Sequence, residues 1–392
     1  MSYIHTEVVH IDAVHPEMAI IERAAALIRA GEVVVFPTET VYGLGADALQ
    51  TQAVERIFAA KGRPFSDPLI VHIAGERALQ DLVSTIPAQV EQLIETFWPG
   101  PLTLILPRSP LVPTLVTAGL DTVAVRMPRH PVALALIRAA GTPIAAPSAN
   151  RFMHISPTTA QHALADLDGR VPLILDGGPC LVGVESTVLD LCSAEPRILR
   201  PGGVSLEALR TVLPDVQLAT RHNNRHEEDH CAQDAQRAPG QLQTHYAPAI
   251  PLLLFEGTVE TMRTAMLHEV RRRSKFGERV GVLVADEDVT AFQDSGALVQ
   301  TLGDAAVPEQ VAAALFAGLR TLETANVQVI LCRSFDEQGL GLAIRDRLMR
   351  AASGKVFKMG MDQLDTTKQA DGCIGQPCAG RDDRAEFQNA VQ

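Results

Sequence analysis

The sequence predicts an α/β protein in which a larger domain with a mixed sheet precedes a smaller α/β domain. Three observations lead to this fold class. Short apolar runs rich in β-branched residues alternate with segments whose apolar residues recur at helical spacing. A polar stretch, residues 215–247, separates two such series. The length of 392 residues also fits two domains, on the rough expectation of ~150 residues per domain.

The first series begins with a helix and a buried strand. Ala19–Ala30 has apolar residues at helical spacing and stops at Gly31, and Val33–Phe36 is a short β-branched run. Thr51 is expected to cap the next helix, which places Lys61 near its C-terminal end. Further strands are expected at 69–73, 102–106, 122–125, 144–146, 173–175 and 187–191, and further helices at 90–98, 132–140, 158–167 and 206–213. We assign this first domain to residues 1–214.

A polar linker is expected over residues 215–248, because this segment has little apolar area to bury. His222, His226 and His230 have a spacing that would place three imidazoles on one helical face. Their polar surroundings offer few groups to orient such ligands, so a linker is favoured over a metal site.

The second series predicts a small open α/β domain over residues 249–357. Strand and helix patterns alternate there, which favours some parallel pairing. The strands are expected at 250–255, 280–284 and 327–331, and the helices at 259–272, 311–322 and 342–352. The polar residues 358–392 are expected to form a flexible tail.

Composition excludes several classes of protein. A hydrophobic content of 46% and a charged content of 20% are typical of a globular protein with ample core. The net charge of −12 argues against a protein that coats nucleic acid. The N-terminus does not resemble a signal peptide, and we find no apolar run of the ~18 residues that a membrane span needs. The six cysteines form no close pair, so we expect free thiols and a cytoplasmic protein.

Polar blocks at the ends of apolar runs indicate a ligand pocket. They combine cations with short hydroxyl and amide side chains on separate loops, which suits a phosphate-bearing ligand. A P-loop and a nucleophile elbow are both missing from the sequence, and the loose dinucleotide pattern at 43–48 is interrupted by the preceding Pro37. The blocks are Pro37–Gly45, Lys61–Pro64, Pro147–Asn150 and Glu185–Thr187.

The same blocks resemble the YrdC family. The resemblance runs in one order from about residue 20 to residue 204, and it also includes Pro68–His72, Trp98–Thr103 and Val125–Pro128. Arg197–Gly202, His245–Pro248 and the trailing α/β domain resemble the long two-domain form of that family, the L-threonylcarbamoyladenylate synthases.

The resemblance implies both a fold and a reaction. The fold would be a twisted mixed sheet with an open concave pocket, followed by a Rossmann-like C-terminal domain. The reaction would convert L-threonine, bicarbonate and ATP into L-threonylcarbamoyl-AMP and pyrophosphate, for threonylcarbamoyladenosine modification of tRNA by a downstream transferase. Mg²⁺ would enter with the triphosphate rather than in a protein cage.

Site residues follow from the resemblance, position by position. The ATP side would comprise Lys61, Arg63, Ser148, Asn150 and Arg200, with Thr122, Asp67 and Tyr246 as additions. The L-threonine side would comprise Thr40, His72, Arg126 and Ser186, with Arg126 suited to a carboxylate. Lys61 and Arg63 would be the catalytic cations. Tyr246 would belong to a lid that ligands order, or else would pack between the domains.

Each residue taken singly also has a structural interpretation, such as a solvated helix end for Lys61 and Arg63, a turn at 148–150 or a core histidine at His72. Their joint occurrence in the family order favours the functional interpretation. Two positions depart from the family pattern: Asp67 stands where an Asn is usual, and Arg151–His154 replace a common Ser-Gly.

Two other functions were weighed. An RNA-binding module is disfavoured as the main role by the net charge and by an aromatic content of 4%. A carbamoyl-transfer domain like that of hydrogenase maturation proteins would come with paired Cys-x-x-Cys zinc segments, which this sequence lacks.

Overall fold

The computed structural model describes residues 5–193, 195–219 and 246–359. The three histidines considered as metal ligands, most of the expected linker and the expected tail beyond residue 359 lie outside the described residues. Cys180, Cys192 and Cys332 lie within them and carry free thiols. No helix in these ranges is long and apolar enough to cross a membrane.

The first domain is built on a mixed sheet that is 11-stranded over the described residues. Its order is β1-β8-β2-β3-β7-β4-β6-β5-β9-β10-β11, and it contains both parallel pairs, such as β4–β6, and antiparallel pairs, such as β5–β6. The mixed sheet expected from the sequence is therefore confirmed. The strands are β1 (Glu7–His10), β2 (Val34–Phe36), β3 (Gly43–Asp47), β4 (Ile70–His72), β5 (Leu102–Pro107), β6 (Thr122–Arg126), β7 (Ile144–Ala145), β8 (Leu173–Asp176), β9 (Thr187–Asp190), β10 (Arg197–Arg200) and β11 (Gln217–Leu218).

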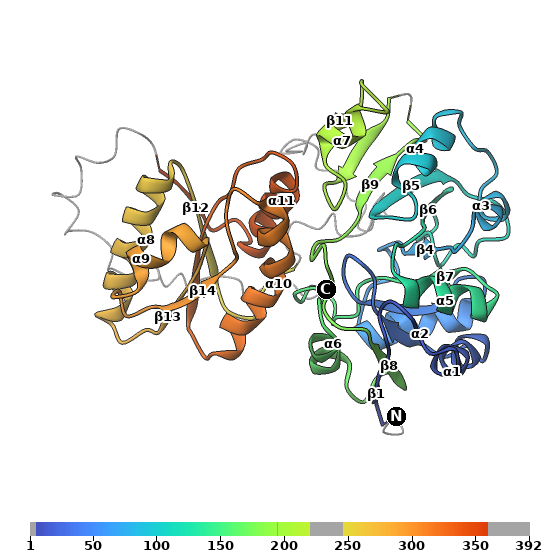
Figure 1. Ribbon diagram of the computed structural model, residues 1–392, viewed down its shortest axis with the longest axis horizontal. Coiled ribbons are helices and arrows are strands. Elements are labelled where there is room, and N and C mark those ends of the chain that lie inside the picture. Colours follow the sequence, from blue (N-terminus) through green and yellow to red (C-terminus); the bar gives the residue numbers. More distant parts are fainter. Residues whose placement is uncertain (1–4, 194, 220–245, 360–392) are drawn as a thin grey trace, which may run out of the picture.

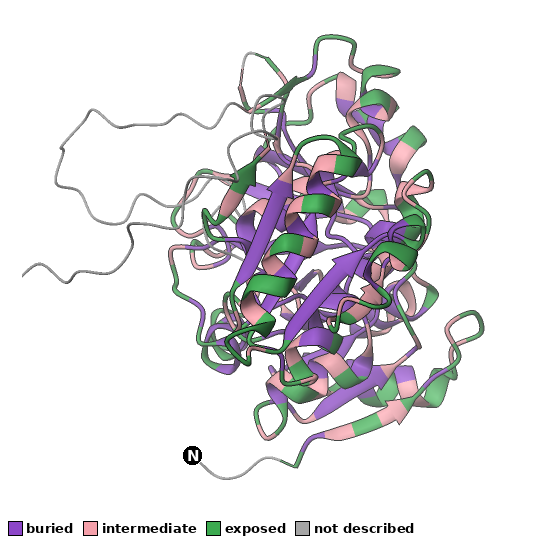
Figure 2. Ribbon diagram, turned by 90° about the vertical axis from the view of Figure 1, so that its left-hand side faces the viewer, coloured by how far each residue is buried: buried purple, intermediate pink, exposed green. Residues whose placement is uncertain are grey.

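Helices flank this sheet (Figure 1). Figure 2, in which the second domain faces the viewer, shows strands coloured as buried and helices whose outer faces are exposed. One core packs α1 and α5 against β2 and β8, and a second, larger core includes α2, α4 and the central strands. Burial of these apolar faces stabilises the layers. The helices are α1 (Met18–Arg29), α2 (Thr51–Lys61), α3 (Glu76–Leu82), α4 (Gln89–Phe97), α5 (Pro131–Ala140), α6 (Ala160–Leu167) and α7 (Leu206–Arg210).

Two local expectations were wrong. Thr51 is the first residue of α2 rather than its cap, and the N-cap Gln50 makes no side-chain hydrogen bond to the helix. The polar block 37–45 was treated as a loop, but its end forms β3, paired antiparallel with β2. A Cβ at Gly45 would lie 2.6 Å from the Phe36 ring, so glycine permits this close pairing although it disfavours strands in general.

The second domain has a fully parallel sheet in the order β14-β13-β15-β12-β16. This confirms a Rossmann-like α/β arrangement of alternating strands and helices. Its elements are β12 (Leu252–Glu256), α8 (Val259–Ser274), β13 (Val280–Val284), a 3₁₀ turn at Asp286–Asp288, α9 (Val289–Phe292), β14 (Leu298–Thr301), α10 (Pro308–Thr324), β15 (Val329–Arg333), α11 (Gly341–Ala351) and β16 (Val356–Lys358). β11 pairs with β10, so the first sheet reaches past the boundary expected at residue 214.

The two domains meet through α10 and α11, which lie between the two sheets (Figure 1). One hydrophobic cluster spans both domains: Val41, Ile155 and Val184 of the first domain share it with Leu315, Phe316 and Ile344 of the second, among others. The interface is therefore a packed core, which fixes how α10 and α11 stand against the loops of the first domain.

Candidate active site

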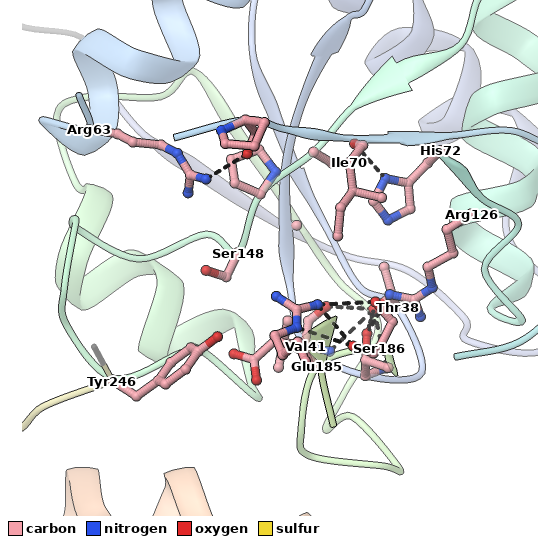
Figure 3. Close-up of a pocket in the computed structure, with 16 residues that line it drawn as sticks. Thr38, Val41, Arg63, Ile70, His72, Arg126, Ser148, Glu185, Ser186 and Tyr246 are labelled. Atoms are coloured by element: carbon pink, nitrogen blue, oxygen red, sulfur yellow. Dashed lines mark hydrogen bonds between the residues drawn. The ribbon is translucent and has the colours of Figure 1, made fainter. Parts of the chain in front are cut away.

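A pocket opens where the polar loops of the first domain converge. Figure 3 shows side chains from separate strands and loops pointing into it. Eight of the predicted site residues line it, namely Thr40, Arg63, His72, Arg126, Ser148, Ser186, Arg200 and Tyr246. The structure thus assembles in one place residues that are up to 206 positions apart in the chain.

Arg126 is the last residue of β6 and is held by three groups. Its Nε donates to the Gly100 carbonyl at 3.2 Å and its Nη1 donates to the Thr40 hydroxyl at 2.9 Å. Its Nη2 lies 2.7 Å from Glu39 Oε1, and both side chains are buried. This pair is a close charge contact without hydrogen-bond geometry, so the outer face of the guanidinium keeps donor capacity for a ligand carboxylate.

His72 ends β4 beside Arg126 and is 3% exposed. Its Nδ1 lies 3.2 Å from the Ile70 carbonyl, and its ring meets Phe36 edge-on at 6.4 Å. Burial, reinforced by the positive charge of Arg126, lowers the pKa of His72 to about 3. The imidazole is therefore neutral at working pH and brings no second cation next to Arg126.

This pKa predicts a pH dependence of stability. A histidine whose pKa falls on folding binds fewer protons in the folded state, so its contribution to stability is lost as pH drops below about 6.5. Between pH 7 and pH 5 the free energy of unfolding should fall by about 2 kcal/mol more in the parent protein than in His72→Gln. Urea unfolding at both pH values measures this difference. Equal losses in the two proteins would show that His72 is not held neutral by burial.

Arg63 follows α2 and points toward the pocket (Figure 3). Its Nε and Nη2 donate to the carbonyls of Asp67 and Pro68 at 3.2 and 2.8 Å, and Nη2 lies 2.9 Å from Asp67 Oδ1. Burial lowers the pKa of Arg63, and the charge of Asp67 opposes that change. The guanidinium is fixed by the backbone of its own loop, which pre-organises it for an anionic ligand.

Asp67 pairs with Arg63 and is not among the residues that line the pocket. It is 2% exposed, and within the described ranges neither carboxylate oxygen accepts a hydrogen bond. Burial raises its pKa, whereas Arg63, Lys61 and Arg200 act in the opposite direction. A buried carboxylate with unused acceptor sites is chemically suited to a ligand hydroxyl or amine, or to a cation.

Lys61 and Asn150 lie beneath the pocket rather than in its lining. Lys61 Nζ donates to the carbonyls of Ser148, at 2.5 Å, and of Asn150. The Asn150 amide in turn donates to the carbonyls of Arg151 and His154. Burial, with the nearby charge of Arg63, lowers the pKa of Lys61 well below its usual value. The two side chains fix the loop 147–154, and so place the half-buried Ser148 at the pocket.

Arg200 ends β10 and faces Ser186, the residue just before β9. Its Nη2 donates to the Ser186 carbonyl at 3.0 Å and to the Ser186 hydroxyl at 3.2 Å. The Ser186 hydroxyl also bonds with the Thr103 hydroxyl at 2.7 Å. Thr122 lies four residues before Arg126 on the same strand and is not among the pocket residues of the described chain.

Tyr246 lines one side of the pocket and is the first described residue after position 245. It is 1% exposed, and its backbone φ of 60° is unusual for a bulky residue and costs about 1–3 kcal/mol. Its ring packs against Phe316 of α10 at 5.6 Å. Tyr246 therefore both lines the pocket and packs between the domains, and its role as a lid that ligands order stays a prediction.

Sequence reasoning missed three charged or polar residues at this site. Thr38 and Glu185 belong to the quoted blocks but were given no role, although both line the pocket. Arg347 of α11 was missed entirely: its Nε donates to Glu185 Oε2 at 2.7 Å. An arginine within a helical pattern looks like a solvent-facing residue, so the sequence carried no signal for it.

Comparison with known proteins identifies the family of this chain. Residues 26–202 match the family model for Sua5, YciO and YrdC, described as telomere recombination, and residues 204–353 match the model of the threonylcarbamoyl-AMP synthase C-terminal domain. The threonylcarbamoyl-AMP synthase of Bacillus subtilis is 47% identical over 339 residues, covering 86% of this chain and 94% of that protein. The chain belongs to the threonylcarbamoyl-AMP synthase family.

A solved structure of this family has the same two-domain fold over most of the chain. The crystal structure of Pyrococcus abyssi Sua5 complexed with L-threonine has a TM-score of 0.84 and 42% sequence identity, over 90% of this chain and 100% of that one. Both the YrdC-like domain and the C-terminal domain expected from the sequence are thus confirmed at the level of the family and the fold.

Proposed function

We propose that this chain catalyses the ATP-dependent synthesis of L-threonylcarbamoyl-AMP from L-threonine and bicarbonate, with release of pyrophosphate. The observation that carries this proposal is a single pocket that brings the buried guanidinium groups of Arg63, Arg126 and Arg200 together around a neutral His72. Three fixed cations in one pocket suit a ligand set with several anionic groups: a triphosphate, an amino-acid carboxylate and a carbamate.

The threonine end of the pocket is assigned to Arg126, Thr40, His72 and Ser186. The donors of Arg126 would bind the substrate carboxylate, and the hydroxyls of Thr40 and Ser186 would bind its polar groups. A neutral His72 can accept a hydrogen bond from the amine without repelling it. The amine reacts after its ammonium form has lost one proton to solvent: its lone pair adds to the carbonyl carbon of bicarbonate and water leaves, which gives a carbamate.

The nucleotide end is assigned to Arg63, Arg200 and Ser148, with Lys61 and Asn150 holding the loop beneath them. A carbamate oxygen then attacks the α-phosphorus of ATP, and the bond to the pyrophosphate oxygen breaks. The protein forms no covalent bond in this scheme, so catalysis consists of alignment and of neutralising the charge on the phosphates. Tyr246 would cover the site while water is excluded.

Mg²⁺ is proposed to arrive with the triphosphate and to neutralise part of its charge. No group of three His, Cys, Asp or Glu side chains in residues 5–193, 195–219 and 246–359 is arranged to hold a metal ion. Asp67 does not line the pocket, but its buried oxygens accept no hydrogen bond in the described chain, and this makes it the candidate for a contact with the ion or the nucleoside.

Asp67→Asn should therefore change cofactor dependence more than the fold. The amide keeps the shape of the side chain and removes the charge near Arg63. We expect a shift of a few fold in the Mg²⁺ or ATP concentration that gives half-maximal turnover, with a similar melting temperature. Titration of Mg²⁺ at fixed ATP measures the shift. A titration curve that overlays that of the parent would remove Asp67 from the nucleotide site.

The domain bounds, the cellular location and the fate of the product are proposed as follows. The catalytic domain would run to the end of β11 at Leu218, and the C-terminal domain would run from residue 249 to the end of β16 at Lys358. A linker would join the two domains, and a tail would follow the second. The reaction would take place in the cytoplasm, where ATP and tRNA are available. Its product would pass to a tRNA threonylcarbamoyl transferase, because a mixed anhydride of this kind hydrolyses readily in water.

Pyrophosphate release tests the function directly. The full chain should release pyrophosphate from ATP when L-threonine and bicarbonate are both present, and omission of either should stop the release. Pyrophosphate release at the same rate with and without L-threonine would contradict the proposal. RNA binding whose affinity falls steeply with salt, in a protein without this activity, would favour the RNA-binding alternative.

A further inference from the structure

Arg347 is a fully buried arginine of α11 that crosses the domain interface. Its side chain is 0% exposed and makes contacts with two separate segments of the first domain. Nε donates to Glu185 Oε2 at 2.7 Å, and Nη2 donates to the Pro201 carbonyl at 3.0 Å. Asp346 accepts from Nη1 at 2.8 Å, which completes the hydrogen bonding of the guanidinium from its own helix.

The two contacted segments form one wall of the pocket. Glu185 directly precedes Ser186, and Pro201 directly follows Arg200. They are packed against each other: the Gly203 amide donates to the Glu185 carbonyl at 3.0 Å, and a Cβ at Gly202 would lie 2.3 Å from that carbonyl oxygen. A displacement of either segment would therefore move Ser186 and Arg200 together.

Arg347 also contacts the residue that closes the pocket. Its guanidinium carbon lies 5.0 Å from the ring centroid of Tyr246, a cation–π distance. Glu185 is the third member of this group, and Ser156 donates to its other oxygen at 2.5 Å. Burial raises the pKa of Glu185, but Arg347 and Arg200, with hydrogen bonds from Ser156 and Arg347, bring it below its usual value. Glu185 is thus a charged partner for Arg347.

We infer that Arg347 is a positioning residue through which the C-terminal domain holds Ser186, Arg200 and Tyr246 in their places at the pocket. The inference rests on the proposed function for its kinetic consequences. It gives the C-terminal domain a part in catalysis that needs no contact with substrate. Without Arg347, the Glu185 carboxylate would stay buried but lose its hydrogen-bonded partner, and the Pro201 carbonyl would lose its donor.

Arg320 provides a matched control on the same interface. This arginine of α10 is also buried, and its Nη2 donates to Asp166 Oδ2 at 2.8 Å and to the Ile155 carbonyl. Neither acceptor residue lines the pocket. Arg320→Met should weaken domain docking to a degree comparable with Arg347→Met, without reaching the pocket wall directly.

The test compares Arg347→Met, Arg347→Lys and Arg320→Met in the full chain. We expect Arg347→Met to lower kcat/KM for ATP and for L-threonine by about 10- to 100-fold, the range found when partners that orient metal-binding side chains are lost. Arg347→Lys keeps a charge for Glu185 but loses the second contact, so it should recover part of the loss. Arg320→Met should show a lowered melting temperature with near-parental kinetics.

Hydrogen–deuterium exchange of the ligand-free protein separates this inference from the proposed function. Faster exchange at 184–188 and 199–204 in Arg347→Met, but not in Arg320→Met, would support positioning even if the parent protein released no pyrophosphate. Parental kinetics in Arg347→Met with only a lowered melting temperature would overturn the inference. So would equal kinetic losses in Arg347→Met and Arg320→Met, because these would indicate a general effect of domain docking.

Discussion

Arg63→Ala should lower kcat/KM for ATP by about 100- to 1,000-fold while the protein remains folded. The guanidinium of Arg63 is fixed by two backbone carbonyls and stands at the pocket, so it is placed for phosphate oxygens without reorganisation. Continuous measurement of pyrophosphate release, with ATP and then L-threonine varied, gives the effect. ATP saturation should suffer more than threonine saturation.

Two further variants make this prediction specific. Arg56→Ala removes an exposed arginine from α2, the helix that precedes Arg63, where it pairs with Glu32, and should leave turnover unchanged. Arg63→Ala with Asp67→Asn removes both members of the buried pair, which controls for the carboxylate left behind in the single variant. Parental kcat/KM in Arg63→Ala, or recovery of activity in the double variant, would show that Arg63 does not act on the nucleotide.

Arg126→Met should combine the loss of threonine binding with a large loss of stability. Arg126 is the close cationic partner of Glu39, whose carboxylate is 3% exposed and accepts no hydrogen bond in the described part of the chain. Removing the guanidinium leaves that charge buried, which typically costs about 3–5 kcal/mol. Urea unfolding measures the stability, and titration with L-threonine measures the binding.

The double variant Glu39→Gln/Arg126→Met separates these two effects. Neutralising Glu39 should recover most of the lost stability, because no buried charge remains unpaired. It should not recover the affinity for L-threonine, because the proposed donor to the carboxylate is still missing. Threonine affinity that returns together with stability would show that Arg126 only balances Glu39.

Much of the fold could be read from local sequence pattern. The buried strands β2, β5, β6 and β13 are apolar, β-branched runs, and α1 and α5 carry their apolar residues on one face. β3 could not be read in this way, because its sequence Gly-Leu-Gly-Ala-Asp has a poor strand propensity. What makes it a strand is its pairing with β2 and β7, in a place where Phe36 and Ile144 leave no room for a Cβ at Gly45, and that is a property of the packed sheet.

The site, like the fold, was predicted from the sequence only in part. Eight of the twelve residues assigned from the family resemblance line one pocket. The sequence motif could not distinguish the roles of Arg63 and Lys61. Arg63 faces the pocket, whereas the Lys61 ammonium donates its hydrogen bonds to the carbonyls of Ser148 and Asn150. Both are cations of one short block, and only the direction of each side chain distinguishes them.

The sequence by itself determined the family, the two α/β units and the order of the polar blocks that meet at the pocket. These properties depend on residue type and spacing along the chain, which a motif records. Only the tertiary structure decided that Glu185 is paired with Arg347, 162 positions away, and that Tyr246 packs between the pocket and α10. Such contacts arise when two separately patterned domains share one hydrophobic cluster, so no local pattern in either domain encodes them.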